Sequence, residues 1–303
     1  MPSEGPTFHL YLPQMRMAHD VIVERARAAE ALGFEGIAFM DHLAPPLADD
    51  QDMWEAMSIA GWVLAHTSTL VVGHLVLCDA VRHPAMLARQ VTSLDHASGG
   101  RFELGIGWGS VPAELATFGV GLLETEERLG RLAESLAILR ALWTGEVVHH
   151  EGEHFTLVGA QQRPVPTRHV PLTIGGTGRR TLALVRAYAD WWNVPLHQLD
   201  RLAERRHEAG DARVSMQRMI AVVPSPSARD DVTATAMRRF GGMRPLVGTP
   251  SELAAHFGAL HGEGVDRFYV WFADFAPVRT LELFAEVIDA LDGRPRPTGT
   301  MTP

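Results

Sequence analysis

The sequence contains no lysine, so all 27 of its basic residues are arginine. This absence excludes two kinds of site that need a lysine amine: a Schiff-base centre and the P-loop of nucleotide-binding proteins. Any anion must be bound by backbone N–H groups or by arginine, whose planar guanidinium forms paired hydrogen bonds.

Cysteine and long apolar runs are also scarce. Cys78 is the only cysteine among 303 residues, which excludes an internal disulfide framework and a cysteine-based zinc site. No apolar run reaches the ~18–20 residues of a membrane span, and the first residues do not form a secretory signal. The net charge of −9 argues against nucleic acid as a partner. We therefore expect a cytoplasmic protein that acts on a small molecule, without nucleic-acid or membrane partners.

Short apolar segments alternate with segments of helical periodicity along the chain. Leu129, Leu132, Leu136 and Leu139, for example, are three or four residues apart, as on one face of a helix. Eight strands alternating with eight helices predict parallel strands with helical crossovers, closed into one (β/α)8 TIM barrel. The expected strands are residues 8–12, 36–40, 70–78, 101–106, 172–174, 191–194, 219–223 and 268–271.

Two segments exceed the simple repeat of this barrel, which we assign to residues 1–293. Residues 145–170 follow the fourth helix, and their alternation, with a turn at Glu151-Gly152, predicts a β-hairpin. Residues 224–249, around the seventh strand, are marked by proline and glycine and contain a candidate short helix. Residues 294–303 form a tail rich in proline and threonine, for which we expect disorder.

A glycine-rich turn, Gly175-Gly176-Thr177-Gly178, follows the expected strand 172–174 and precedes a helix. The G-x-G-x-x-G fingerprint of dinucleotide folds fails here, and the P-loop fails for want of lysine. What remains is a turn whose backbone N–H groups can hold a phosphate at a helix N-terminus. Thr177 can add a hydroxyl, and Arg179 or Arg180 can add a positive charge. A turn that only starts a helix remains the alternative.

Other strand ends also place candidate groups at the mouth of the barrel. Asp41 and His42 close the second strand, where an imidazole can transfer a proton and the carboxylate can orient it or bind backbone. Alternating glycines, Gly105, Gly107 and Gly109, leave room for a flat ring against the backbone after the fourth strand. Cys78 lacks the neighbours of a catalytic cysteine, so we assign it to packing.

Two further motifs have a chemical and a structural interpretation. Residues His150 to His154 spell H-E-x-x-H, but alternating apolar residues on either side favour a hairpin, where the two histidines lie too far apart to share zinc. We therefore expect no metal. Trp191 and Trp192 point to opposite faces of the sixth strand, so that one faces either the barrel mouth or the core.

Several of these segments together resemble the luciferase-like oxidoreductases, and most closely the branch that uses the deazaflavin coenzyme F420. The resemblance covers residues 7–291, and the segments that carry it are "LDHASGGRFELGIGWGSVPAELATFGV", "RLGRLAESLAILRALWTG" followed by "EGEHFTL", "IGGTGRRTLALVRAYADWWNV", "RARAAEALGFEGIAFMDHL" and "GTPSELAAHFGALHGEGVDRFYVWF".

The resemblance implies a TIM barrel with the cofactor ring in its mouth and the cofactor phosphate at the turn Gly175–Gly178. It also implies an irregular backbone, often a non-proline cis peptide, near Leu77, Cys78 and Asp79, against the middle ring of the cofactor. His42 is the implied proton donor or acceptor. Many relatives read Gly-Ala-Gly-Trp after the fourth strand, whereas this chain reads Gly107-Trp108-Gly109-Ser110. Trp108 therefore stacks over the ring or fills substrate space, and the role of Glu114 stays open.

The resulting hypothesis is hydride transfer between coenzyme F420 and an organic substrate by a homodimeric enzyme. Cofactor binding is expected at Leu77, Cys78, Asp79, Gly107, Trp108, Gly175, Gly176, Thr177, Gly178 and Arg179, with His42 and Asp41 as catalytic residues. The alternatives are an FMN-dependent monooxygenase that uses a partner reductase and oxygen, a flavin-binding protein without catalysis, and a zinc hydrolase.

Overall fold

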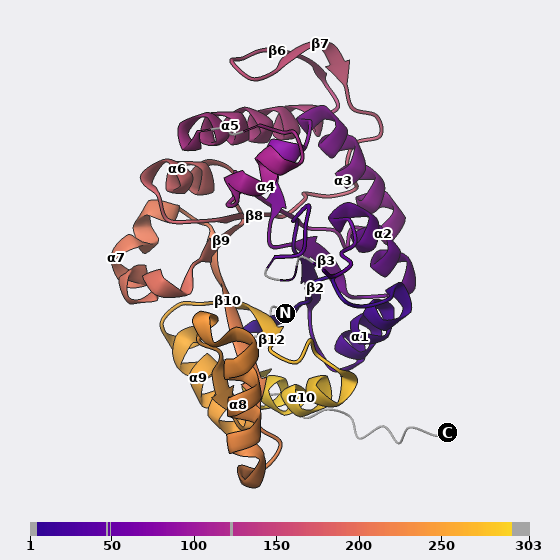
Figure 1. The fold of residues 1–303 in the computed structure, drawn as a ribbon. Coiled ribbons are helices and arrows are strands. Elements are labelled where there is room, and N and C mark those ends of the chain that lie inside the picture. Colours follow the sequence, from indigo (N-terminus) through magenta and orange to yellow (C-terminus); the bar gives the residue numbers. More distant parts are fainter. Residues whose placement is uncertain (1–4, 47, 49, 122–123, 293–303) are drawn as a thin grey trace.

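Parallel strands form one curved sheet at the centre of the molecule (Figure 1). The computed structural model describes residues 5–46, 48, 50–121 and 124–292. The strands are β1 (Thr7–Tyr11), β2 (Gly36–Phe39), β3 (Val71–His74), β4 (Leu77–Cys78), β5 (Leu104–Gly107), β6 (Val147–Glu151), β7 (Thr156–Gln161), β8 (Leu172–Gly175), β9 (Trp191–Val194), β10 (Arg213–Val222), β11 (Leu246–Gly248) and β12 (Arg267–Phe272).

The strand order in this sheet is β3-β2-β1-β12-β10-β9-β8-β5-β4, with β11 paired to β10. The two ends of this order meet, because β4 follows β3 in the chain after only two residues. Ahead of that junction in the chain, Val72 of β3 forms a parallel bridge with Phe102, which lies just before β5. The sheet therefore closes nearly into a barrel, which confirms the TIM barrel predicted from the alternating pattern.

Helices cover the outside of the barrel (Figure 1). Two of them begin at clear capping groups: Thr249 and Glu252 form a capping box at the start of α9, and His83 caps the helix that starts at Pro84. The α-helices are α1 (His19–Ala31), α2 (Ala56–His66), α3 (Pro84–Ser98), α4 (Pro112–Thr117), α5 (Thr125–Leu142), α6 (Arg179–Tyr188), α7 (Leu202–Arg205), α8 (Arg229–Phe240), α9 (Pro250–Gly262) and α10 (Val278–Asp292). Short 3₁₀ turns are η1 (Asp79–Val81), η2 (Leu196–Arg201), η3 (Arg206–Ala209), η4 (Pro226–Ala228) and η5 (Gly241–Met243).

The core between strands and helices is apolar and aromatic. Phe8 of β1 and Phe268 of β12 stack with their ring centroids 5.6 Å apart, and Phe257 and Phe284 from α9 and α10 pack edge-on to Phe8. All four rings are almost completely buried. Burial of such rings stabilises the contact between sheet and helices and fixes the barrel that positions the site.

The structure differs from the predicted elements at three strands. The strand expected at 70–78 is broken: β3 ends at His74 and β4 comprises only Leu77 and Cys78. The strand expected at 219–223 begins much earlier, at Arg213. Within the segment 224–249 the chain forms α8 and also the short strand β11. The apolar run from Leu70 to Cys78 hides the break after His74, because periodicity alone does not mark where a buried strand ends. The early part of β10 was missed because polar residues such as Ser215 and Gln217 interrupt its apolar pattern.

Strands β6 and β7 form an antiparallel hairpin within residues 145–170, as the alternating pattern indicates. Figure 1 shows this hairpin projecting beyond α5, away from the barrel. The tail expected at 294–303 lies outside the described residues. In the part of the chain that the structure describes, none of the helices is both long and apolar enough to cross a bilayer.

Candidate active site

A cavity of about 290 Å³ lies at the carboxyl ends of β2, β4, β5 and β8. This is the edge of a barrel where loops after the strands build active sites. We call it the glycine-lined cavity, and its lining residues are Met40, Asp41, His42, Leu75, Val76, Leu77, Cys78, Gly107, Trp108, Gly109, Ser110, Val111, Glu114, Leu115, Gly175 and Gly176. The structure thus brings together residues from four of the segments that sequence reasoning had selected.

His42 is paired with Glu114 across this cavity. The Nδ1 atom of His42 lies 3.0 Å from Oε2 of Glu114, which comes from the short helix α4. The other carboxylate oxygen of Glu114 accepts the backbone N–H groups of Leu43 and Ala44. An ionised carboxylate can only accept, so this pairing places the proton of neutral imidazole on Nδ1. Nε2 of His42 is then left able to accept a proton.

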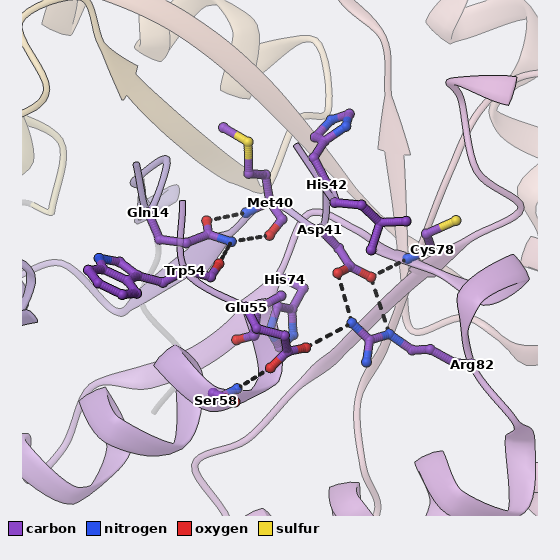
Figure 2. Close-up of polar contacts among 12 residues, drawn as sticks. Gln14, Met40, Asp41, His42, Trp54, Glu55, Ser58, His74, Cys78 and Arg82 are labelled. Carbon is purple, nitrogen blue, oxygen red and sulfur yellow. Dashed lines mark hydrogen bonds and ion pairs between the residues drawn. The ribbon is translucent and has the colours of Figure 1, made fainter. Parts of the chain in front are cut away.

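Asp41 turns away from His42, as Figure 2 shows. Its carboxylate accepts the backbone N–H of Cys78 at 2.8 Å and two bonds from the guanidinium of Arg82, the shorter at 2.7 Å. Arg82 also reaches Glu55, at 3.3 Å. Asp41 therefore does not orient the imidazole. Its side chain links the residues that follow β2 to the backbone of β4.

A second buried side chain fixes the strand end that carries His42. The side-chain amide of Gln14 bonds both backbone groups of Met40: Nε2 donates to the carbonyl at 2.6 Å, and Oε1 accepts the N–H at 3.2 Å (Figure 2). Gln14 also donates to the carbonyl of Trp54 at 3.2 Å. Because both groups of Met40 are bonded in this way, the residues that follow it leave β2 in a defined direction.

The irregular backbone expected near Leu77, Cys78 and Asp79 occurs earlier. The non-proline cis peptide joins Leu75 to Val76, in the junction between β3 and β4. The position inferred from the resemblance was therefore wrong by two residues, because it assumed one unbroken strand to Cys78. Leu75 and Val76 both line the glycine-lined cavity, so this junction forms part of its wall.

The turn Gly175–Gly178 leads from β8 into α6. Its last residue, Gly178, is the N-cap of α6 and provides no side-chain cap, so the first-turn N–H groups of this helix have no side-chain partner there. Trp192 of β9 holds the turn in place, since its indole Nε1 donates to the carbonyl of Gly176 at 2.8 Å. Such uncapped N–H groups fit a phosphate. Arg179 is exposed beside them, whereas the neighbouring Arg180 is paired with Glu126.

The glycines of the cavity serve two different purposes. A Cβ atom at Gly107 would lie 2.9 Å from the Val76 side chain, and one at Gly109 would lie 2.8 Å from the sulfur of Cys78. These two glycines are needed for packing within the protein. At Gly175 an added Cβ would meet nothing closer than 3.8 Å. Packing within the protein therefore does not require glycine at this position, and its surface in the cavity is open to a ligand.

Trp108 lines the cavity, and the guanidinium of Arg128 packs over its indole ring. The guanidinium carbon of Arg128 lies 4.7 Å from the Trp108 ring centroid, and its Nη1 donates to the carbonyl of Gly109 at 2.5 Å. Arg128 is buried on α5. The loop after β5 is thus fastened to α5, and the indole is positioned as a wall of the cavity.

Cys78 and Asp79 occupy different environments. Cys78 lines the cavity, and burial raises the pKa of its thiol, which favours the uncharged form and agrees with a packing role. Asp79 is buried beside Arg131, with its carboxylate 3.6 Å from Nε, and burial raises its pKa to about 6. It is not among the residues that line the cavity, so the structure does not bring Asp79 to the site.

The described residues contain no group of three or more His, Cys, Asp or Glu side chains that could hold a metal ion. In the H-E-x-x-H segment, His150 contacts Glu134 of α5 at 3.2 Å. The same carboxylate accepts the backbone N–H groups of Glu153, His154 and Phe155. This cluster fastens the hairpin to α5.

Three contributors escaped the sequence reasoning or were left open by it. Glu114 pairs with His42 over a separation of 72 residues, Arg82 binds Asp41 over 41, and Trp192 binds the turn at Gly176 over 16. Only the contact at Gly176 could have been anticipated from the sequence. Strands five and six of a parallel barrel are neighbours, so a tryptophan near the start of the sixth strand can reach the turn that follows the fifth.

Known proteins resemble this chain along most of its length. The family model described as luciferase-like monooxygenase matches residues 7–267. An F420-dependent glucose-6-phosphate dehydrogenase of Nakamurella multipartita is 34% identical over 170 residues, which is 56% of this chain and 50% of the relative. The chain thus spans about half the length of the curated relatives it matches.

Two solved structures share the fold. An F420-dependent secondary alcohol dehydrogenase, in complex with an F420-acetone adduct, superposes with a TM-score of 0.81 at 20% identity and covers 95% of this chain and 99% of its own. An EDTA monooxygenase from Chelativorans superposes with a TM-score of 0.83 at 14% identity and covers 97% of this chain and 96% of its own.

Proposed function

This chain belongs to the luciferase-like monooxygenase family, and from that premise we propose that it is an oxidoreductase that uses coenzyme F420. The reaction is a hydride transfer between the deazaflavin and a small organic substrate. The proposal is supported by the names of the relatives, which are F420-dependent dehydrogenases. The observation that carries it is the joining of an uncapped glycine turn and a His42–Glu114 pair in one cavity.

The residues present fit this coenzyme in two parts. The N–H groups at the start of α6, with Thr177 and Arg179 beside them, provide donors and charge for its phosphate. Leu75 and Val76 in the junction before β4, Leu77 in β4, and Gly107 and Trp108 at the end of β5 provide apolar surface for its ring. When bound, the deazaflavin accepts or gives up a hydride, and the protein supplies position and proton transfer.

The proton chemistry is assigned to His42. With Nδ1–H donated to Glu114, Nε2 is free to take the proton of a substrate hydroxyl or, when charged, to return it to a carbonyl oxygen. Glu114 stabilises the imidazolium that forms, because its negative charge lies beside the ring. Asp41 acts as a positioning residue: it holds the Cys78 backbone and Arg82 in place and has no contact with His42 in the structure.

An FMN-dependent monooxygenase is the second candidate, since an EDTA monooxygenase shares the fold. Titration of the protein with coenzyme F420 and with FMN separates the two. We expect F420 to bind more tightly and its fluorescence to be quenched in the complex. Tight FMN binding without F420 binding would overturn the proposal. Incubation of reduced and oxidised F420 with a set of alcohols, aldehydes and ketones then identifies the direction and the substrate.

We also propose a homodimer, on the strength of the family resemblance. Sedimentation equilibrium of the purified protein tests this assignment, which is independent of the cofactor: a mass near 33.2 kDa at micromolar concentration contradicts it, because that is the mass of one chain.

A further inference from the structure

A second cavity, of about 340 Å³, adjoins the glycine-lined cavity. We call it the aromatic chamber, and its lining residues are Tyr11, Met15, Arg16, Met40, His42, Pro46, Ala48, Arg239, Phe240, Met243, Trp271 and Phe275. Met40 and His42 line both cavities. The imidazole therefore stands at the boundary between them, where a proton-transferring group can serve a molecule in either one.

The walls of the aromatic chamber form a continuous set of rings. Tyr11 of β1 and Trp271 of β12 lie with centroids 5.3 Å apart, and Phe240 of α8 lies 5.6 Å from Trp271 and 6.0 Å from Phe275. Three methionines complete the apolar lining. Aromatic rings and thioethers bind apolar and ring-shaped molecules well and offer few partners to a molecule covered with hydroxyl groups.

One polar group among these rings has no internal partner. The indole Nε1 of Trp271 is buried and forms no hydrogen bond to any described residue. A buried N–H without a partner is costly, and no side chain of the chamber offsets this cost.

Two arginines provide the charge of the aromatic chamber. Arg16 and Arg239 are both exposed, and neither forms an ion pair with a described residue. Arg16 donates Nε to Gln51 and lies 6.0 Å from the Phe275 ring, while Arg239 donates one N–H to the carbonyl of Ala273. The described lining residues include no carboxylate. The remaining N–H groups of both guanidinium groups are therefore available to an anionic group on a ligand.

The backbone supports the position of Arg16 and of the Phe275 ring. Arg16 has φ of 60° and Phe275 has φ of 64°, both in the left-handed region that side chains larger than glycine rarely adopt. Such conformations persist where the surrounding structure holds them, and they concentrate at binding sites. In the chamber they place a guanidinium against an aromatic ring.

From these contacts we propose that the aromatic chamber binds the substrate, an apolar alcohol or ketone that carries an acidic group. The apolar body lies among the rings, the reacting oxygen lies at His42, and the acidic group lies at Arg16 and Arg239. The inference rests on the proposed function. In the oxidising direction the alcohol carbon gives its hydrogen as a hydride to the coenzyme and the hydroxyl gives its proton to Nε2 of His42, which leaves a carbonyl group.

This substrate differs from the sugar phosphate in the name of the relative from Nakamurella. A sugar presents several hydroxyl groups, and each would lose hydrogen bonds to water without regaining them among Met15, Phe240 and Trp271. A site built from apolar walls therefore discriminates against sugars and accepts aromatic or alicyclic compounds of similar volume.

The test compares three probes by calorimetry: 4-oxo-4-phenylbutanoate, its methyl ester and glucose 6-phosphate. Each is titrated into the protein with and without oxidised coenzyme F420. We expect the keto acid to bind about tenfold more tightly than its uncharged ester, and glucose 6-phosphate to be unable to displace it. Equal affinity for acid and ester, or preferential binding of glucose 6-phosphate, overturns the assignment.

Variants locate the binding. Met243→Ala removes an apolar contact of the chamber, and Met237→Ala is its matched control: both methionines are about equally exposed, at 39% and 45%, and only Met243 lines the chamber. We expect a loss of keto-acid affinity on the order of tenfold for Met243→Ala and for Phe240→Ala, and none for Met237→Ala. Equal effects of the two methionine variants contradict the proposal.

The acidic group is tested at the arginines. Arg16→Asn keeps a residue type that tolerates the left-handed backbone, and Arg239→Gln keeps a hydrogen-bonding side chain. Each is expected to reduce the preference for acid over ester, and the double variant to abolish it. The probes are expected to bind without the coenzyme, so failure of F420 to bind would refute the proposed function alone. Failure of the probes to bind, both with and without F420, would refute substrate binding in the aromatic chamber.

Discussion

The glycine-lined cavity and the aromatic chamber meet at His42 but are built from different parts of the chain. The first is lined by residues of the β2, β4, β5 and β8 ends, several of them glycine, where backbone forms much of the surface. The second is lined by large side chains from β1, β12 and α8. A backbone surface suits a ligand that is shared by many proteins, because backbone is insensitive to substitution. A side-chain surface changes with each substitution and suits a ligand peculiar to one protein.

This difference underlies our proposal for the two ligands. The N–H groups at the start of α6 can bind a phosphate without a side chain, which suits the proposed coenzyme. The rings of Tyr11, Phe240 and Trp271 offer an apolar surface of defined shape, which suits the proposed substrate.

The largest effect is expected at the residue that both cavities share. His42→Ala should lower F420-dependent turnover of the substrate found by screening about 10²- to 10⁴-fold, because the proton acceptor is lost. Coenzyme affinity should change little. Steady-state kinetics and fluorescence titration measure the two quantities. His207→Ala, at an exposed histidine of η3, is the control. Unchanged turnover in the His42 variant would remove the residue from the mechanism.

Gly175→Val should damage coenzyme binding and leave the aromatic chamber intact. A valine is well suited to a strand, and the site has room for its Cβ on the protein side. Its bulk at the cavity surface should weaken F420 binding about tenfold to a hundredfold, without a change in thermal midpoint or in keto-acid binding. Gly242→Val, where an added Cβ meets nothing within 4 Å, is the control. Wild-type F420 affinity in both variants would place the coenzyme elsewhere.

Acid sensitivity should arise on the side of the glycine-lined cavity, at His74. Burial lowers the pKa of His74 to about 4, and the side chain lies beside Glu55 and the Asp41–Arg82 pair (Figure 2). In the unfolded chain the imidazole of His74 takes up a proton near pH 6.5, whereas in the folded protein it does so only near pH 4. The folded state therefore loses stability as the pH falls from about 6.5 towards 4. Between pH 7 and pH 5 the expected loss is about 2 kcal/mol.

Urea unfolding of the wild type and of His74→Gln at pH 7 and pH 5 measures this contribution. The variant should be less stable at pH 7, and its free energy of unfolding should fall less on acidification than that of the wild type. Identical dependence on pH in the two proteins would show that His74 does not bind a proton on unfolding and would assign the acid sensitivity to other groups.

The smallest effect is expected for Glu114→Gln. The amide still accepts a hydrogen bond but cannot stabilise a charged imidazole as a carboxylate does, so turnover should fall on the order of tenfold. Unchanged turnover would show that the contact at 3.0 Å does not influence proton transfer.

Local signals made the barrel and half of the site predictable. The alternation of apolar and helical segments predicted the parallel barrel, although the central sheet of the described residues has ten strands where eight were expected. The spacing of Gly175, Gly176 and Gly178 next to a strand indicated the turn at α6. In contrast, the break after His74 left no mark, since the run from Leu70 to Cys78 is apolar almost throughout.

The partner of His42 could not be deduced from its neighbour in the sequence. Successive residues of an extended chain point to opposite sides, and this directs Asp41 to Arg82 while His42 faces Glu114. The aromatic chamber was equally hidden, because Tyr11, Phe240 and Trp271 come from positions far apart in the chain and share no motif. Contacts of this kind are created by the closure of the barrel.

The bond from the Cys78 backbone to the Asp41 carboxylate has a consequence for ligand binding. A side chain, held by two hydrogen bonds from Arg82, joins the end of β2 to the short strand β4. The length of the aspartate side chain thereby sets the separation between these two strand ends. A ligand meets a preorganised cavity, so little of its binding free energy is spent on separating the strands.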